Sequence, residues 1–235
     1  DVVFISGMSK AKGTNPYQPL LDLGVCVIDI PSSSSIAAVE EDIEFVGSVV
    51  GKETEAQAVV EAMNGKINEI AALAEGIEEK KSVYFEISPA PYQYSFGQGT
   101  FLNEMIELIG ATNIFADQDG WIPVSAEQVV AANPDVIITN ADYMEGAVAE
   151  IEAREGWAEV AAVKNHEVYL IGANVSSQPC QNIVDALVEI AADVYPEVYG
   201  ELIDAYGYNV PEGKNQSEAV RLKPTFREIL FRMAS

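Results

Sequence analysis

Apolar side chains recur every three or four positions along residues 54–79, where alanine, valine, methionine and isoleucine form one continuous stripe. This period predicts an amphipathic α-helix. A helix of that length would extend for about 35–40 Å, which is longer than most helices in compact domains. Thr54 and Gln57 have the spacing of a capping box at its start. The pattern fits an ordinary surface helix as well as a helix that connects two α/β units.

Short apolar runs on both sides of residues 54–79 favour the connecting helix. They predict two strands before it and three after it, at Val2–Ser6 and residues 25–30, 82–88, 136–139 and 168–171. Segments whose pattern predicts helices lie between these runs. They include Ile36–Val50 and residues 100–109, 125–133 and 148–160. Ser125 and Gln128 repeat the capping-box spacing. Because strands and helices alternate, we expect an α/β fold with mostly parallel sheets flanked by helices.

The chain contains an internal repeat. Residues 1–5 (DVVFI) match residues 135–139 (DVIIT), and each segment leads through a helix to another strand. A helix and a whole strand–helix pair precede the second copy, whereas nothing precedes Asp1. We therefore expect the chain to begin part-way through its first α/β unit, which would be incomplete.

Composition restricts the partners of the protein. Acidic residues number 37 and basic residues 13, which gives a formal net charge of −24. A chain this acidic is repelled by nucleic acids and by anionic lipid surfaces, so we expect neither as a partner. No apolar run approaches the ~18–20 residues of a membrane span, so we expect no membrane-spanning helix.

Residues that could carry out catalysis are sparse. The single histidine, His166, lies in a polar segment between a helix and a strand, where a solvated turn is expected. One histidine rules out a histidine-rich metal site, and Gly97 and Gly99 lack the continuation of a phosphate-binding loop. Cys26 and Cys180 form no CxxC pair, and Cys26 lies in an apolar run that predicts a buried side chain. We predict no catalytic residues and no resident metal site.

Four segments, in this order, resemble a known family: residues 99–117, 121–138, 157–169 and 191–197. The family consists of the solute-binding proteins of ABC importers for iron–siderophore, haem and vitamin B12. The resemblance implies two α/β lobes joined by one long helix. It implies a partial N-terminal lobe at residues 1–53, a linking helix at 54–81, a C-terminal lobe at 82–206 and a tail at 207–235.

The resemblance also implies a function. Proteins of this family bind a metal chelate outside the cytoplasm, in the periplasm or as cell-surface lipoproteins, and deliver it to an ABC permease and its ATPase. No cofactor is implied, because the chelate is the cargo. Contact with the membrane would occur only through the permease or a lipid anchor outside this chain. Two alternatives remain open: a chelatase-like enzyme and a non-transport interaction module on the same architecture.

Residues that follow the predicted strands are candidates for ligand contacts, because ligands of open α/β sheets bind beyond the carboxyl ends of the strands. Aromatic side chains there suit a flat, largely apolar chelate, and packing within the loops is the alternative. The candidates are Tyr92, Tyr94, Phe96, Tyr143 and Met8. The resemblance implies a further candidate, Gln178, in a loop where many relatives carry a ligand-binding arginine and this chain has none. The resemblance adds Trp121, which matches an aromatic position at the ligand cleft of vitamin B12 binders.

Glu127 has two interpretations. As a carboxylate in the first turn of a helix, it would stabilise the helix through the macrodipole by ~0.3–1 kcal/mol. The resemblance implies instead that Glu127 matches a glutamate through which each lobe contacts arginines of the permease.

The distribution of cations indicates which chelates fit. No lysine or arginine occurs between Lys81 and Arg154, a span that would supply most of the second lobe's ligand-facing wall. Burial of a triply negative ferric catecholate needs cations that replace its lost hydration. We therefore expect a corrinoid, a haem or a ferric hydroxamate.

The end of the chain has a distinct composition. Five of the 13 cations lie in the last 22 residues, beside apolar residues at helical spacing: Phe226, Ile229, Leu230 and Met233. We expect an amphipathic helix that packs back on the first lobe, and a frayed terminus is the alternative.

Overall fold

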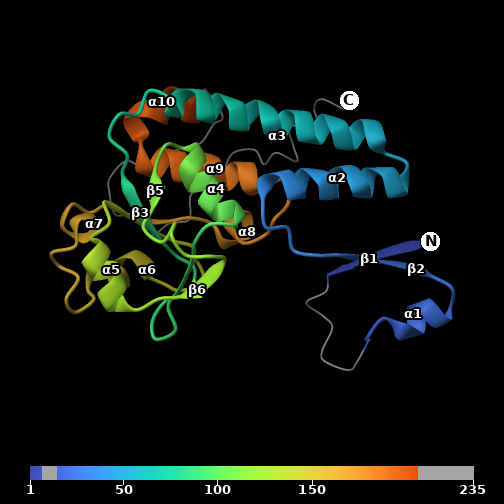
Figure 1. Cartoon of the computed structure of the whole chain (residues 1–235), viewed down its shortest axis with the longest axis horizontal. Coiled ribbons are helices and arrows are strands. Elements are labelled where there is room, and N and C mark those ends of the chain that lie inside the picture. Colours follow the sequence, from blue (N-terminus) through green and yellow to red (C-terminus); the bar gives the residue numbers. More distant parts are fainter. Residues whose placement is uncertain (7–14, 206–235) are drawn as a thin grey trace.

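A computed structural model describes residues 1–6 and 15–205 of the chain, with side chains as far as residue 202. The candidate ligand residue Met8 and the predicted tail helix lie outside these described residues. Helices α2 (Ile36–Val50) and α3 (Glu53–Ala74) run side by side along one flank, with a larger sheet near one end and a smaller sheet near the other (Figure 1). Within the described residues, no helix has both the length and the apolar content that crossing a membrane requires.

The larger sheet has four parallel strands in the order β5-β3-β7-β8. They are β3 (Ser82–Glu86), β5 (Thr112–Asn113), β7 (Val136–Thr139) and β8 (Val168–Leu170). Alternate residues of β3 enter two separate cores, so that Val83 and Phe85 pack with α3, α4 (Phe101–Leu108) and α9 (Ile183–Val194). Tyr84 packs on the other face, in the core that Val129 of α5 (Ala126–Ala132) and Trp157 share. The parallel sheet flanked by helices confirms the predicted fold class.

The smaller sheet pairs β1 (Val2–Ser6) with β2 (Cys26–Ile30) in parallel, and α1 (Gln18–Asp22) lies between them in the chain. Both strands were predicted from their apolar runs. The prediction that Cys26 is buried is wrong, because its side chain is exposed. Cys26 begins β2, which in the described part of the chain pairs with β1 alone, so the residue lies at the end of an edge strand.

The long helix begins and ends differently from the prediction. It spans Glu53–Ala74, its N-cap is Lys52, and no side chain caps it, so the predicted box of Thr54 and Gln57 does not form. The turn after α2 decides this start: Gly51 adopts a left-handed conformation with φ 70°, and the Lys52 N–H donates to the Gly47 carbonyl at 2.7 Å. A Cβ at Gly47 would lie 2.4 Å from that of Ala56, so glycine allows the two helices to meet.

Residues 148–160 are also less helical than predicted. Helix α6 covers Ala147–Glu152, and a turn then leads to the short α7 (Ala161–Lys164). By contrast, the capping box of Ser125 and Gln128 forms at the start of α5 as predicted. Two further short helices, α8 (Ala173–Ser176) and α10 (Pro196–Ala205), flank α9, and an antiparallel pair joins β4 (Tyr94–Phe96) to β6 (Trp121–Pro123).

Helix α9 buries three carboxylates on one face. Asp185, Glu189 and Asp193 are four residues apart, and each side chain is under a tenth exposed. Asp185 has Lys66 at 3.7 Å, and Glu189 accepts the Gly172 N–H at 3.3 Å. Burial raises the pKa of all three carboxyls, that of Glu189 to about 7, with the neighbouring Asp185 charge adding to the increase.

The pKa of Glu189 predicts a pH dependence of stability. Because the folded-state pKa lies above the unfolded value, the folded protein binds more protons between about pH 4.5 and 7. The free energy of unfolding should therefore fall as the pH rises through this window. Glu189→Gln should reduce the difference in the free energy of unfolding between pH 5 and pH 8 by up to ~3 kcal/mol. Urea unfolding at the two pH values measures this difference.

The exposed Glu159 provides the control for this measurement. Glu159→Gln should leave the pH dependence as in the parent protein. An unchanged pH dependence in Glu189→Gln would contradict the burial of a neutral carboxyl at this position.

Candidate ligand-binding site

Exposed aromatic side chains gather in the loops that follow the strands of the larger sheet. Tyr92 lies after β3 with 79% of its surface exposed, and Tyr143 lies after β7 with 72% exposed. Gln178, which follows β8, is exposed as well. Because β3, β7 and β8 are parallel, these three loops leave the same edge of the sheet, where open α/β sheets bind their ligands (Figure 1).

The antiparallel pair β4–β6 presents two more aromatic residues. In its register Phe96 lies opposite Trp121, and Tyr94 lies opposite Pro123, so all four side chains project from the same face. Trp121 is 52% exposed, and its ring packs edge-on against Phe96 at 6.0 Å and Phe101 at 6.2 Å. Tyr94 is 43% exposed. Trp121 thus keeps about half of its side chain exposed while two aromatic neighbours hold its ring in place.

Phe96 requires a correction to its predicted role. Its side chain has no exposed surface, because it packs against Phe85 with ring centroids 5.3 Å apart, beneath Trp121. A ligand on this surface would meet Trp121 first. Phe96 therefore supports the candidate surface from below and is not part of it.

A buried ion pair lies next to residues 87–94, the segment after β3 that carries Tyr92 and Tyr94 and is called the tyrosine loop below. Glu86 is the last residue of β3 and is fully buried. The Arg154 guanidinium donates to both of its carboxylate oxygens, at 2.7 and 2.8 Å, and also to Glu150. Tyr84 and Gln93 donate to the same Glu86 carboxylate at 3.2 and 3.0 Å. Four donor atoms thus satisfy a charge that would otherwise be costly to bury.

The electrostatics of this cluster fix its protonation. Burial alone would lower the pKa of Arg154, but hydrogen bonds to Glu86 and Glu150 outweigh burial and raise that pKa. Burial, followed by the nearby Glu86 charge, raises the pKa of the Tyr84 hydroxyl. Arg154 therefore remains a cation and Tyr84 a neutral donor. Because two carboxylates already engage Arg154, its charge is not free to attract an anionic ligand.

Sequence reasoning missed Glu86 and Arg154. A helix over residues 148–160 would have made Arg154 an ordinary helical position, whereas the observed turn brings its guanidinium over Trp157, with 4.7 Å to the ring centroid. One signal was available: Glu86 is a charged residue in a strand otherwise rich in apolar and aromatic residues, and Arg154 is the first arginine of the chain.

Polar contacts connect the loops after β7 and β8. Asn140, which is 2% exposed, donates to the hydroxyls of Ser176 and Ser177 at 3.1 and 3.0 Å. The Asp142 carboxylate accepts the Ala173 N–H at 2.9 Å. The segments that carry Tyr143 and Gln178 are therefore held next to one another.

His166 lies away from this surface, in the predicted turn. It has a positive φ of 57°, its side chain is largely exposed, and its Nδ1 lies 2.9 Å from Glu152. The described residues hold no group of three or more histidine, cysteine or acidic side chains that could bind a metal ion.

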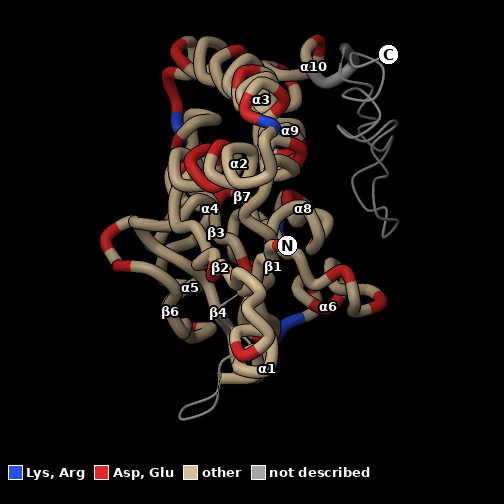
Figure 2. Tube along the Cα trace, turned by 90° about the vertical axis from the view of Figure 1, so that its right-hand side faces the viewer, with Lys and Arg blue, Asp and Glu red and all other residues tan. Residues whose placement is uncertain are grey.

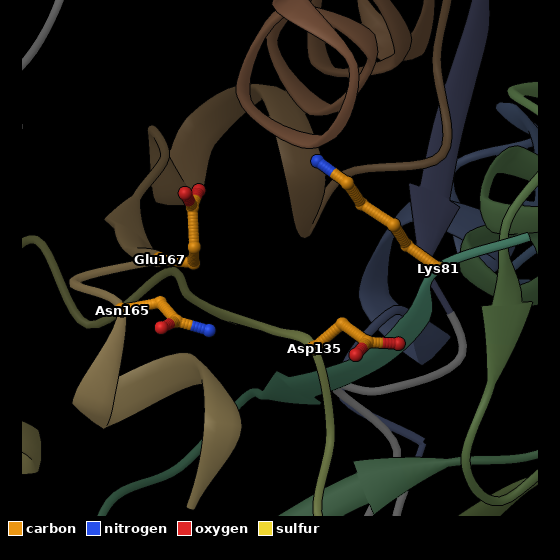
Figure 3. A pocket seen from close by; sticks show the side chains of 4 residues that line it. All are labelled: Lys81, Asp135, Asn165 and Glu167. Carbon is orange, nitrogen blue, oxygen red and sulfur yellow. The ribbon is translucent and has the colours of Figure 1, made fainter.

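A polar cavity opens at the opposite, amino edge of the sheet. Lys81, Asp135, Asn165 and Glu167 line about 440 Å³ (Figure 3). The Lys81 ammonium donates to the Val194 carbonyl at 2.6 Å and lies over the Tyr195 ring, and Asp135 accepts from Ser82. These charged groups serve the packing of α9 and the start of β3, and no aromatic side chain lines the cavity. The carboxyl edge is the better candidate for a chelate.

Glu127 lies in the first turn of α5 and is exposed. Its backbone N–H and the Ser125 hydroxyl lower the pKa of its carboxyl, which keeps it ionised. An exposed carboxylate at a helix start is compatible with both interpretations of Glu127.

Comparison with known proteins decides the family. The profile described as "Periplasmic binding protein" matches residues 1–175, about three quarters of the chain. The chain belongs to the periplasmic binding protein family. The predicted resemblance to solute-binding proteins of ABC importers is thereby confirmed.

Individual relatives agree with this membership. The periplasmic binding protein described here is 34% identical to a Bacillus subtilis protein named uncharacterized ABC transporter substrate-binding lipoprotein YvrC, over 86% of this chain and 64% of the relative. It is 26% identical to a Halobacterium salinarum cobalamin-binding protein, over 73% of this chain and 48% of the relative. The chain thus spans about half to two thirds of the length of these relatives.

A solved structure shares the fold. It is described as a possible iron-binding (periplasmic solute-binding) protein from Staphylococcus epidermidis, with 27% identity and a TM-score of 0.74. The similarity covers 83% of this chain and 76% of that one.

The buried ion pair of Glu86 and Arg154 predicts that replacing Arg154 strongly destabilises this periplasmic binding protein. Arg154→Met should lower the free energy of unfolding by ~3–5 kcal/mol, because it leaves the buried Glu86 charge uncompensated. Lys164→Met, which removes an exposed partner of Glu159, should change it by less than ~0.5 kcal/mol in the same urea titration.

A double substitution separates charge from packing. Glu86→Gln combined with Arg154→Met removes the unpaired charge and should recover part of the lost stability. If the double variant is no more stable than Arg154→Met, lost packing against Trp157 causes the effect, and the electrostatic explanation is wrong.

Proposed function

We propose that this protein binds a metal chelate outside the cytoplasm and delivers it to an ABC permease. One observation carries the proposal: in a chain of the periplasmic binding protein family, Trp121 presents a half-exposed ring on a fixed aromatic base. Exposed Tyr92, Tyr94 and Tyr143 lie in segments around the same edge of the sheet. Aromatic faces of this kind bind flat, weakly polar ligands by stacking and burial.

The charges of the site favour a neutral or weakly charged chelate. Acidic residues are spread over the helices, whereas basic residues are few (Figure 2). Residues 82–153 contain no lysine or arginine, and the next cation, Arg154, is engaged by Glu86 and Glu150. We therefore propose a corrinoid, a haem or a ferric hydroxamate as ligand. The names of the relatives support this class, since one is a cobalamin-binding protein and another a possible iron-binding protein.

We propose no catalytic role, and the chelate is cargo, not a cofactor. The partners would be the permease and its ATPase. The location would be the periplasm or the cell surface, as for the lipoprotein relative. We propose a division into an N-terminal lobe (1–53), a linking helix (54–81), a C-terminal lobe (82–206) and a terminal segment (207–235).

Titration of the full-length natural protein tests the ligand class. A cobalamin, haemin and a ferric hydroxamate should each quench the fluorescence of Trp121, with affinities that change little between low and high salt. A ferric catecholate should bind more weakly. Tight catecholate binding that weakens strongly with salt would show that cations dominate the site and would overturn this ligand class.

Substitution of the exposed tryptophan tests the surface itself. Trp121→Ala should weaken chelate binding about 10-fold or more, because stacking and burial of one aromatic ring contribute at least ~1.4 kcal/mol. Isothermal titration calorimetry gives the affinity without the tryptophan signal. Phe45→Ala removes a similarly exposed aromatic ring from α2 and should leave affinity unchanged. Equal affinities in both variants would place the ligand elsewhere.

Reversal of the Glu127 charge tests docking to the permease. Glu127→Arg should keep ligand affinity but reduce stimulation of the transporter ATPase several-fold, because an arginine would face permease arginines. Loss of the helix-start carboxylate alone should lower stability by no more than ~1 kcal/mol. Glu155→Arg reverses another exposed charge and serves as control. Normal stimulation by Glu127→Arg would leave Glu127 as a helix-start residue only.

A further inference from the structure

Gln93 connects the buried ion pair to the candidate ligand surface. It lies between Tyr92 and Tyr94 in the chain, but its side chain is 8% exposed while its neighbours are 79% and 43% exposed. We propose that Gln93, anchored on Glu86 and Arg154, is a positioning residue that holds both tyrosines toward the ligand. This inference rests on the proposed function, because it assigns the tyrosines to the chelate.

Gln93 is fixed by its side chain and by its backbone. Its side-chain amide donates to Glu86 Oε2 at 3.0 Å, and its carbonyl accepts the Val124 N–H at 3.0 Å. On either side, the Ile87 N–H donates to the Tyr94 carbonyl at 2.9 Å and the Tyr94 N–H donates to the Ser88 carbonyl at 3.2 Å. The tyrosine loop is thus tied to the end of β3 and to the segment after β6.

The direction of the tyrosines follows from this anchor. Successive side chains of an extended segment point to opposite sides. With the Gln93 amide held inward on Glu86, Tyr94 at the start of β4 points to the opposite, outward side. Tyr92 lies in the bend just before Gln93, where its side chain is exposed. A loop already held in this arrangement loses less conformational freedom when a ligand binds, which strengthens binding without adding a contact.

The anchor itself is rigid. The two oxygens of Glu86 receive the planar guanidinium of Arg154, a bidentate geometry that fixes the orientation of the carboxylate. Arg154 is held in turn by Glu150 and by the Trp157 ring. Residues of α6 and the turn after it therefore fix the orientation of the Glu86 carboxylate, which accepts the hydrogen bond from Gln93.

Two variants test the anchor, and each is measured with and without a ligand. Gln93→Met keeps the length of the side chain but removes its donor. In the ligand-free protein, hydrogen exchange of residues 92–95 should become faster. Affinity for whichever of a cobalamin, haemin and a ferric hydroxamate the natural protein binds most tightly should fall about 3- to 10-fold. Gln93→Lys retains an N–H donor toward Glu86 and should remain close to the natural protein in both measurements.

Gln98→Met is the matched control. Gln98 also donates its side-chain amide to a carboxylate, that of Asp119 at 3.0 Å, but on an exposed part of the chain. Its substitution should change neither the exchange of residues 92–95 nor the affinity.

The outcomes separate this inference from the proposed function. Faster exchange in Gln93→Met, with no chelate bound by the natural protein, would support the anchor and overturn the proposed function. Unchanged exchange and unchanged affinity would overturn the anchor. Weaker binding with unchanged exchange would also overturn it, because Gln93 would then act by direct contact. If Gln93→Met fails to fold, Gln93→Lys and Gln93→Ala are compared without ligand. Slower hydrogen exchange of residues 92–95 in Gln93→Lys than in Gln93→Ala supports the anchor, and equal exchange overturns it.

Discussion

The parallel pairing of β3 between β5 and β7 is the constraint on which the rest of the structure depends. A parallel strand needs a crossover connection to its neighbour, so helices must return along the faces of the sheet. Both faces of β3 are buried for this reason, one against α3, α4 and α9 and the other against the core around Trp157. The same pairing places the loops after β3, β7 and β8 at one edge, where the exposed aromatics lie.

A charged residue at the end of such a strand carries a cost. Glu86 lies where both faces of the sheet are already covered, and its charge is tolerated because Arg154, Tyr84 and Gln93 supply donors. These donors come from three different segments, so satisfying one carboxylate also fixes their relative positions. The buried charge thereby contributes to the shape of the candidate surface, although replacing such a pair by apolar residues is often neutral for stability.

Rigidity and exposure are combined in the aromatic surface. Trp121 contacts Phe96 and Phe101 and remains half exposed, and the backbone pairing of β4 with β6 sets its position. Among the described residues, Phe45 on α2 is a singly exposed ring, whereas Tyr92, Tyr94, Trp121 and Tyr143 lie in segments around the edge where open α/β sheets bind ligands. The absence of basic residues from 82 to 153 means that shape and stacking, not charge, would select the ligand.

The sequence alone determined the elements that arise from short-range periodicity. The strands Val2–Ser6 and Val136–Thr139, the helix Ile36–Val50 and the capping box at Ser125 follow from patterns within a few residues, and so does the α/β class. The exposure of Tyr92 and Tyr143 also follows from their places after strands.

The tertiary structure decided which side chains meet. Glu86 and Arg154 are 68 positions apart, and no local pattern links them. Phe96 is buried because Trp121 and Phe85 cover it, Cys26 is exposed because β2 lies at an edge, and α3 begins at Glu53 because the turn after α2 sets its start. Periodicity fixes which face of an element is apolar, but the partner of a side chain depends on how distant elements pack, and a single sequence does not encode that in any local pattern.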